Sequence, residues 1–246
     1  MALELHGMSY SPYSEKARWA LDHHRVPYTW HEHTPMLGEG KLRKLARVSG
    51  KERVSVPLAV DGDLVLRDSL EIAKHAESVG KGARLFANEA AVATWAARSA
   101  DALDAARVLL LDRLLADREA LRESLPPWLP GLLRPLATPI AARATRHLVR
   151  KYGADGIDRD AATAKLREVL GAMRKVLGSR STVLDGFSYA DIAMAVVLQM
   201  ISPVAGDYIV LGPARRRAWT EPGLAAEYAD LVAWRDAVYA KRRRPG

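Results

Sequence analysis

One short segment, residues 56–71, constrains the fold of this chain more than any other. β-forming residues flank Asp61-Gly62-Asp63 on both sides, and an Asp-Gly pair between β-formers predicts a two-residue hairpin turn. Asp68 follows at once as a candidate helix N-cap, with Glu71 three residues later to complete a capping box. The segment therefore predicts a β-hairpin that leads directly into a helix.

The residues before this segment alternate between strand and helix patterns. Ser11-Pro12 predicts a helix start, because serine suits the cap and proline suits the first helical position. That helix ends before Pro27. Strands are expected at 2–6 and 28–33, and a short basic helix at 41–48. The resulting order, β-α-β-α-β-β-α, is that of a thioredoxin-like domain over residues 1–80, and residues 80–88 read as a linker.

Beyond the linker the pattern is helical to the end of the chain. The expected helices are 90–125, 140–152, 158–177, 192–201 and 225–241. Five prolines break residues 126–139, and residues 203–222 read as irregular. We therefore expect an all-α second domain over residues 88–246.

Composition excludes several classes of chemistry. The chain has no cysteine, which removes disulfides, thiolate metal sites and a cysteine nucleophile, so any reacting sulfur must arrive with a ligand. No long uncharged apolar run and no signal-like start are present, so we expect a cytoplasmic protein without a membrane span.

Basic runs at 215–217 and 241–244 contribute to a net charge of +8. They lack interleaved aromatic residues, so we interpret them as solvated helix ends or a mobile tail, with no nucleic-acid partner.

Histidines at two places suggest metal ligands at first sight. His23-His24 would point in different directions on a helix, and His31-Glu32-His33 on a strand supplies two ligands at most. We therefore interpret these as surface histidines and expect no metal.

Four motifs resemble the glutathione transferase family in its order and spacing. They are Ser11-Pro12-Tyr13-Ser14, Val56-Pro57, Asp68-Ser69 and Phe187-Ser188-Tyr189-Ala190-Asp191-Ile192. The resemblance spans essentially the whole chain. It implies a thioredoxin-like N-terminal domain that binds glutathione as a co-substrate, followed by an all-helical domain, with detoxification as the usual context. The last motif is structural: Ser188 caps a buried helix, Asp191 reaches back, and Phe187 packs on Ile192.

The resemblance also implies how the thiol is activated. Ser11 would donate a hydrogen bond to the glutathione thiolate beside the positive end of its helix, which favours the anion. Tyr10 and Ser14 are alternative hydroxyls. Both positions of a thioredoxin-type dithiol, Ser11 and Ser14, are serine here, so dithiol exchange is excluded. The class within the family stays open.

The remaining glutathione contacts follow from the same resemblance. Val56, before a cis Pro57, would pair with the peptide backbone. Asp68, Ser69 and the first amides of their helix would hold the γ-glutamyl group. The loop at 48–55 is longer than usual, and it offers Lys51 and Arg53 as candidate contacts to the glycyl carboxylate.

The second substrate would be a small apolar electrophile. Trp128 and Trp219, in the two irregular stretches, are candidates to line its site. The family usually dimerises, so a homodimer is expected. Two other hypotheses stay open: a non-catalytic binding or scaffold protein with this fold, and a glutathione-dependent isomerase, dehalogenase or peroxidase.

Overall fold

The computed structural model describes residues 2–35, 37–50, 52–126, 129–152 and 158–244. It consists of two compact units. Unit 1 comprises Met1–Ala96, Thr182–Val196 and Ala237–Gly246, and unit 2 comprises Ala97–Ser181 and Val197–Asp236. Unit 1 thus includes two short C-terminal segments as well as the N-terminal α/β region.

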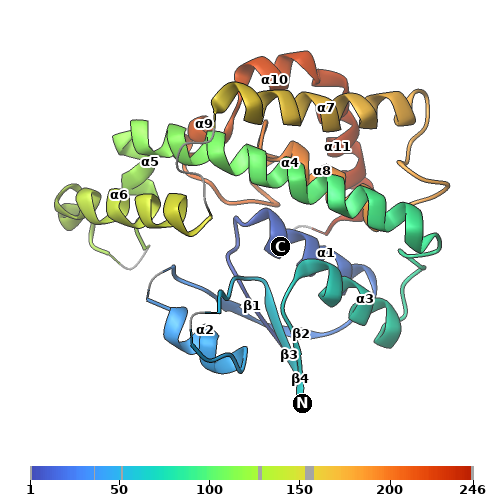
Figure 1. Cartoon of the computed structure of the whole chain (residues 1–246), viewed down its shortest axis with the longest axis horizontal. Helices are drawn as coiled ribbons and strands as arrows, with labels where there is room; N and C mark the ends of the chain where they lie inside the picture. The colour runs from blue at the N-terminus through green and yellow to red at the C-terminus, as the bar shows by residue number, and fades with distance from the viewer. Residues whose placement is uncertain (1, 36, 51, 127–128, 153–157, 245–246) are drawn as a thin grey trace. The chain divides into compact units, whose positions relative to one another are not determined.

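A four-stranded mixed sheet forms the centre of unit 1, in the order β2-β1-β3-β4 (Figure 1). The strands are β1 (Leu3–Gly7), β2 (Tyr28–Glu32), β3 (Leu58–Asp61) and β4 (Leu64–Leu66). β1 runs parallel to β2 and antiparallel to β3, and β3 runs antiparallel to β4. With its helices this sheet is the expected thioredoxin-like arrangement.

Helices cover both faces of the sheet (Figure 1). α1 (Pro12–His23) and α3 (Ser69–Val79) share one core cluster with Leu3 and Leu5 of β1. α2 (Glu39–Leu45) contributes Leu42 to a second cluster, which includes Leu58. Because side chains alternate along a strand, these two clusters lie on opposite faces.

The hairpin forms where the sequence predicts it. Asp61 pairs with Leu64, which leaves Gly62 and Asp63 as the two loop residues. Gly62 has φ +59°, a left-handed conformation that glycine adopts without steric cost. A positive φ at the first loop position is what a hairpin turn requires there.

Unit 1 also contains the start of α8 (Tyr189–Leu198) and the end of α11 (Ala229–Arg242). The Tyr189 amide donates to the Leu85 carbonyl at 3.1 Å. Trp19 of α1 is fully buried, and its ring lies 4.5 Å from the ring of Tyr239 between centroids. These contacts join the C-terminal segments to the α/β core.

The other regular elements that the structure describes are all helices, which is the expected all-α character. They are α4 (Glu89–Ala116), α5 (Arg118–Glu123), the 3-10 turn η1 (Gly131–Leu133), α6 (Arg134–Lys151), α7 (Arg159–Leu177), α9 (Pro213–Trp219) and α10 (Pro222–Glu227). In the part of the chain that is described, no helix combines the length and apolar character that crossing a membrane requires.

Several predicted helix boundaries were wrong. The single helix expected at 90–125 is interrupted at Asp117, whose carboxylate accepts from the Glu119 and Ala120 amides and begins α5. α6 begins at Arg134 rather than at 140, because Pro135 occupies its first turn, where no amide donor is needed. The helix expected at 225–241 is divided between α10 and α11.

The stretch 203–222, expected to be irregular, contains α9. The Glu123 carboxylate of α5 accepts from the amides of Ala214 at 3.1 Å and Arg215 at 2.8 Å. The cap of α9 thus comes from a side chain about ninety residues earlier in the chain. The residues next to α9 in the sequence therefore do not indicate where it begins.

Several arginines of the basic runs 215–217 and 241–244 form hydrogen bonds or ion pairs with other parts of the chain. Arg243 is 5% exposed and bonded to Glu15, so the expectation of a free tail at 241–244 was wrong for this residue. In the other run, Arg216 donates to the carbonyls of Pro203 and Val204, and Arg217 pairs with Glu119. These arginines brace the fold of their own units.

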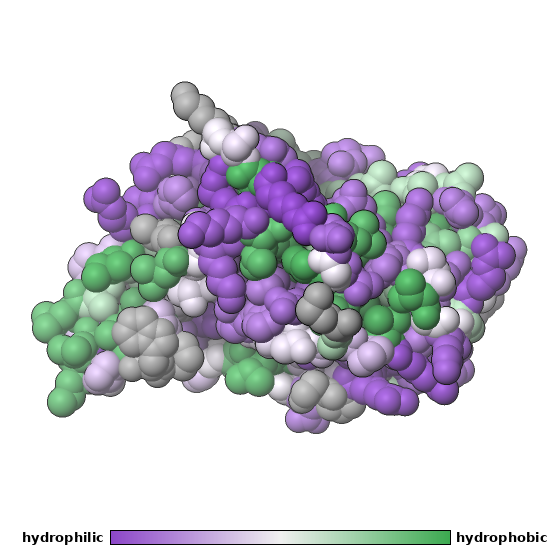
Figure 2. All heavy atoms as spheres, turned by 90° about the horizontal axis from the view of Figure 1, so that it is seen from below, coloured by the Kyte–Doolittle hydropathy of each residue, from purple (hydrophilic) through white to green (hydrophobic). Residues whose placement is uncertain are grey.

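Unit 2 has an exposed apolar stripe on η1 and α6, where green side chains gather at the left of Figure 2. Its members are Leu132, Leu133, Leu136 and Ile140. Clustered apolar side chains on a surface are typical of contact areas for other molecules.

Candidate functional site

Three loops of unit 1 leave the sheet at the same edge. His6, near the end of β1, pairs with Leu58 at the start of β3. Leu66, at the end of β4, pairs with Ala59. Because β3 is antiparallel to both neighbours, the end of β1, the start of β3 and the end of β4 meet there. The loop with Ser11 and the turn with Asp68-Ser69 therefore begin at the same edge of the sheet at which the loop with Val56-Pro57 enters β3.

Ser11 is both a helix cap and a hydrogen-bond donor without an acceptor. Its Oγ accepts from the Ser14 amide at 3.4 Å, and the residue is 6% exposed at the N-terminus of α1. Among the described residues, nothing accepts the proton of the Ser11 hydroxyl. The positive end of α1 and this proton together favour a negatively charged atom beside Ser11.

The other two candidate hydroxyls are placed differently. Ser14 is fully buried, and its Oγ accepts from the Met8 amide at 3.1 Å, so it braces the loop after β1. A Cβ at Gly7 would lie 2.8 Å from that Oγ, which explains the glycine. Tyr10 is half-buried in the turn before α1. Ser11 is the hydroxyl at the helix terminus itself.

The Val56-Pro57 peptide bond is cis, as the resemblance implies. Pro57 is buried, and the Val56 side chain packs against the cluster around Leu42 and Leu58. Within the described part of the chain, the Val56 main chain makes no backbone hydrogen bond. An extended peptide could therefore pair with it as an added strand.

Asp68 and Ser69 begin α3 as predicted. The Asp68 Oδ1 atom accepts from the amides of Leu70 at 2.6 Å and Glu71 at 2.9 Å. Glu71 reaches back to the Arg67 amide at 2.9 Å. Among the residues described, the Ser69 amide has no acceptor, so it is the donor that this helix start offers to an anion.

Tyr189 is a site residue that sequence reasoning missed. Its hydroxyl donates to the Ser69 Oγ at 3.4 Å, and the side chain is almost fully buried. Burial raises the pKa of the Tyr189 phenol, which favours its protonated, hydrogen-bond-donating form. Ser69 thus accepts from Tyr189 and keeps its own proton for another acceptor. The sequence placed Tyr189 within a capping motif, with no signal for a partner 120 residues away.

The capping motif around Tyr189 is built on Asp191. Its carboxylate accepts from the Val183 amide at 2.7 Å, the Ser188 amide at 2.8 Å and the Ser188 hydroxyl at 3.0 Å. The Phe187 ring lies against the rings of Trp19 and His23. Asp191 therefore holds the segment before α8 and with it the position of Tyr189.

For the other four residues predicted from the sequence, no described contact places the side chain near Ser11, Val56 or Ser69. Arg53 is exposed in the loop before β3. Lys51 and Trp128 lie outside the described residues. Trp219 is 3% exposed and lies in α9 of unit 2, not in an irregular stretch. The roles suggested for these four residues stay predictions.

Comparison with known proteins agrees with this arrangement. Residues 5–82 match the glutathione S-transferase N-terminal domain family. A glutathione S-transferase from Methylobacillus flagellatus, solved with glutathione bound, is 19% identical over 98% of this chain and 96% of its own, with a TM-score of 0.60. A glutathione transferase from Phanerochaete chrysosporium is 18% identical over the full length of both chains, with a TM-score of 0.63.

A third similar structure is glutathione S-transferase I from maize in complex with an atrazine glutathione conjugate. It is 19% identical over 98% of this chain and 93% of its own, with a TM-score of 0.61. No curated protein matches the chain. Residues 5–82 therefore form a glutathione S-transferase N-terminal domain, and the whole chain has the glutathione S-transferase fold.

Proposed function

We propose that this protein binds glutathione at the sheet edge of unit 1 and catalyses attack of its thiolate on a small apolar electrophile. The observation that carries the proposal is the Ser11 hydroxyl, buried at the N-terminus of α1 with no acceptor among the described residues. A free thiol is mostly protonated at neutral pH, and the thiolate is the nucleophile. A donor and a helix terminus that favour the anion lower the thiol pKa.

The same edge offers groups for the rest of the peptide. The Val56 main chain would pair with the cysteinyl backbone of glutathione, in the manner of an added strand. The Ser69 amide and hydroxyl would donate to the γ-glutamyl carboxylate, and the exposed Asp68 carboxylate would accept from its ammonium group. These contacts position the sulfur at Ser11.

The similar structures support a glutathione ligand for this fold. One of them holds glutathione and another holds an atrazine glutathione conjugate. Sequence identities near 19% extend the fold to this chain, and the reaction is carried over as part of the proposal. The homodimer, the cytoplasmic location and the detoxification role are likewise predictions from the resemblance.

The test is a glutathione titration of the purified protein at several pH values, with the ultraviolet absorbance of the thiolate as the signal. We expect saturable binding and a bound thiol pKa at least one unit below that of free glutathione. Ser11→Ala should return the thiol pKa toward the free value while binding persists. Ser14→Ala and Tyr10→Phe are the matched hydroxyl controls, and a larger effect from either would transfer the role to that residue.

Other outcomes favour the other hypotheses. Binding without a thiolate signal would favour a ligand-holding protein. No binding at millimolar glutathione would favour a scaffold that keeps the fold without the chemistry. Binding with a thiolate signal, but no conjugation of a panel of aryl halides and enones, would favour an isomerase, dehalogenase or peroxidase that uses the same activated sulfur.

A further inference from the structure

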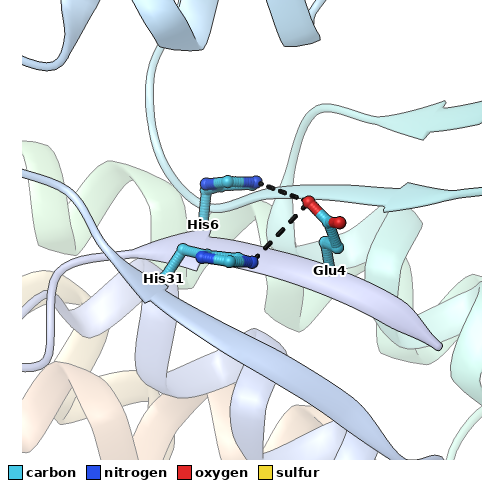
Figure 3. Close-up of side chains that lie close together, drawn as sticks. All are labelled: Glu4, His6 and His31. Carbon is cyan, nitrogen blue, oxygen red and sulfur yellow. Dashed lines mark ion pairs between the residues drawn. The ribbon is translucent and has the colours of Figure 1, made fainter.

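Three metal-ligating side chains converge on one face of the sheet in unit 1, as Figure 3 shows. β1 contributes Glu4 and His6, and β2 contributes His31, which is paired in register with His6. Leu3 and Leu5 alternate with Glu4 and His6 along β1 and face the core with α1 and α3. The three polar residues therefore lie on the opposite face, the one that carries α2.

One nitrogen atom of each histidine lies near the same carboxylate oxygen. The Nε2 atoms of His6 and His31 each lie 3.6 Å from the Oε2 atom of Glu4. The two imidazole rings are stacked, with centroids 4.5 Å apart and planes 12° from parallel. One ligand atom from each residue lies within 4.8 Å of the other two.

Both nitrogen atoms are buried and unsatisfied. The Nε2 atoms of His6 and His31 are inaccessible to solvent and have no hydrogen-bond partner among the residues that the structure describes, since 3.6 Å to Glu4 is too long for a hydrogen bond. Leaving a buried polar atom unpaired is unfavourable. Two such atoms aimed at one carboxylate thus need an explanation.

A neutral imidazole carries a lone pair on one of its two ring nitrogens, and this is the form that binds metals. Each histidine of this cluster can therefore offer one nitrogen ligand to an ion beside the Glu4 carboxylate.

We propose that Glu4, His6 and His31 form a binding site for a divalent transition-metal ion, with Zn²⁺ as the best match. Two histidines and one carboxylate are a common zinc donor set. Ligands about 2 Å from a tetrahedral ion lie about 3.3 Å apart, so the 3.6 Å spacings need little change. The stacked rings must tilt toward each other so that both lone pairs meet at the ion.

The site is open on one side. The Glu4 side chain is 50% exposed and that of His31 is 34% exposed, which allows an ion to enter and a water molecule to complete the coordination. The positive charge of Lys41 opposes binding of a cation. Replacing Lys41 by Ala should therefore tighten the site.

The test is calorimetric titration of Zn²⁺ into the purified protein without a histidine tag, at pH 7.5. Co²⁺ serves as a spectroscopic probe, because its visible absorption intensifies in a four-coordinate nitrogen and oxygen site. We expect one Zn²⁺ per chain, a cobalt spectrum of the four-coordinate type and a rise in the thermal unfolding temperature with Zn²⁺.

Variants identify the ligands. His31→Ala is the main variant, because His31 is only half-buried and its loss should leave the fold intact, as far-ultraviolet circular dichroism would verify. Glu4→Gln is the second. Each should weaken Zn²⁺ binding at least tenfold and remove the thermal shift. His147→Ala, at an exposed histidine of α6, is the matched control and should change neither.

Three outcomes would overturn the proposal. They are no saturable Zn²⁺ binding, equal binding by the wild type and His31→Ala, or loss of binding in His147→Ala instead. Binding that survives in Ser11→Ala would show that the metal site is independent of the proposed glutathione site.

Discussion

Arg243, after the end of α11, forms two hydrogen bonds with Glu15 of α1, although 228 residues separate them in the chain. The Nε–Oε1 and Nη2–Oε2 distances are 2.7 Å and 3.2 Å. Glu15 is 1% exposed, and Arg243 also contacts Asp22. Burial works against the charged guanidinium, but the two carboxylates outweigh it and raise the pKa of Arg243. The end of the chain is thereby fixed to the helix that carries Ser11.

Removing this guanidinium should destabilise unit 1. Arg243→Ala leaves the Glu15 charge buried without its partner, which costs about 3–5 kcal/mol in comparable cases. We expect a loss of that order in the free energy of unfolding, measured by urea denaturation. Arg244→Ala, at the exposed neighbour, is the control and should change stability by less than about 0.5 kcal/mol. Equal effects of the two variants would show that the buried pair does not contribute.

Tyr189→Phe tests whether Tyr189 orients Ser69 for glutathione. The variant removes the hydroxyl that donates to the Ser69 Oγ and keeps the ring in place. One net hydrogen bond of about 0.5–1.5 kcal/mol corresponds to a roughly two- to tenfold loss of affinity. We expect that loss in the glutathione dissociation constant by calorimetry. Tyr228→Phe, which also loses a buried hydroxyl contact, to the Arg167 carbonyl, should leave the affinity unchanged.

Asp191→Ala should be among the most destabilising substitutions in unit 1. It leaves two backbone amides and the Ser188 hydroxyl without their acceptor in a buried segment. Each unpaired group costs about 1–3 kcal/mol, so a total above about 3 kcal/mol is expected in urea denaturation. Asp191→Asn keeps one oxygen acceptor and should lose clearly less. If the two variants were equally stable, the hydrogen bonds would not be the cause.

His24 should make the protein less stable in mild acid. The ring is fully buried, and among the described residues neither of its nitrogen atoms has a hydrogen-bond partner. Burial and the adjacent His23 lower the pKa of His24 against the opposing effect of Glu77. Below pH 6.5 the unfolded chain binds a proton that the folded protein resists. The contribution of the neutral His24 ring to the free energy of unfolding is therefore fully present above pH 6.5. It is lost as the pH falls toward the pKa of His24 in the folded protein.

The measurement is the free energy of unfolding at pH 7.5 and 5.5. His24→Gln removes this titration and should reduce the difference between the two pH values, by up to about 1.4 kcal/mol for each pH unit of the lost shift. The pKa of His6 is lowered as well, so part of the pH dependence of stability should remain in His24→Gln. His147→Gln should keep the full wild-type difference. An unchanged pH dependence in His24→Gln would exclude a role for His24.

The sequence predicted the elements whose signals are local. Ser11 and Pro12 mark the start of α1, and Asp68 with Glu71 marks that of α3. Gly62 marks the hairpin turn. Each of these signals acts through hydrogen bonds or backbone angles within about four residues. The neighbouring residues in the sequence are therefore enough to predict it. The fold class of both regions followed from these elements.

The sequence did not predict features that depend on distant partners. α9 was missed because its cap is Glu123 of another helix. Arg243 was taken as part of a solvated tail, because its partner is Glu15 at the other end of the chain. His31 was interpreted as a surface histidine, because a strand alone supplies two ligands at most; strand pairing brings it beside His6.

The sequence by itself thus determined the strand and helix order of residues 1–80, the caps of α1 and α3, and the set of hydroxyl candidates for thiol activation. Tertiary structure decided how deeply each candidate hydroxyl is buried, which tyrosine contacts Ser69 and which charges are buried. The physical reason is that burial and side-chain pairing depend on segments brought together by packing, whatever their separation along the chain.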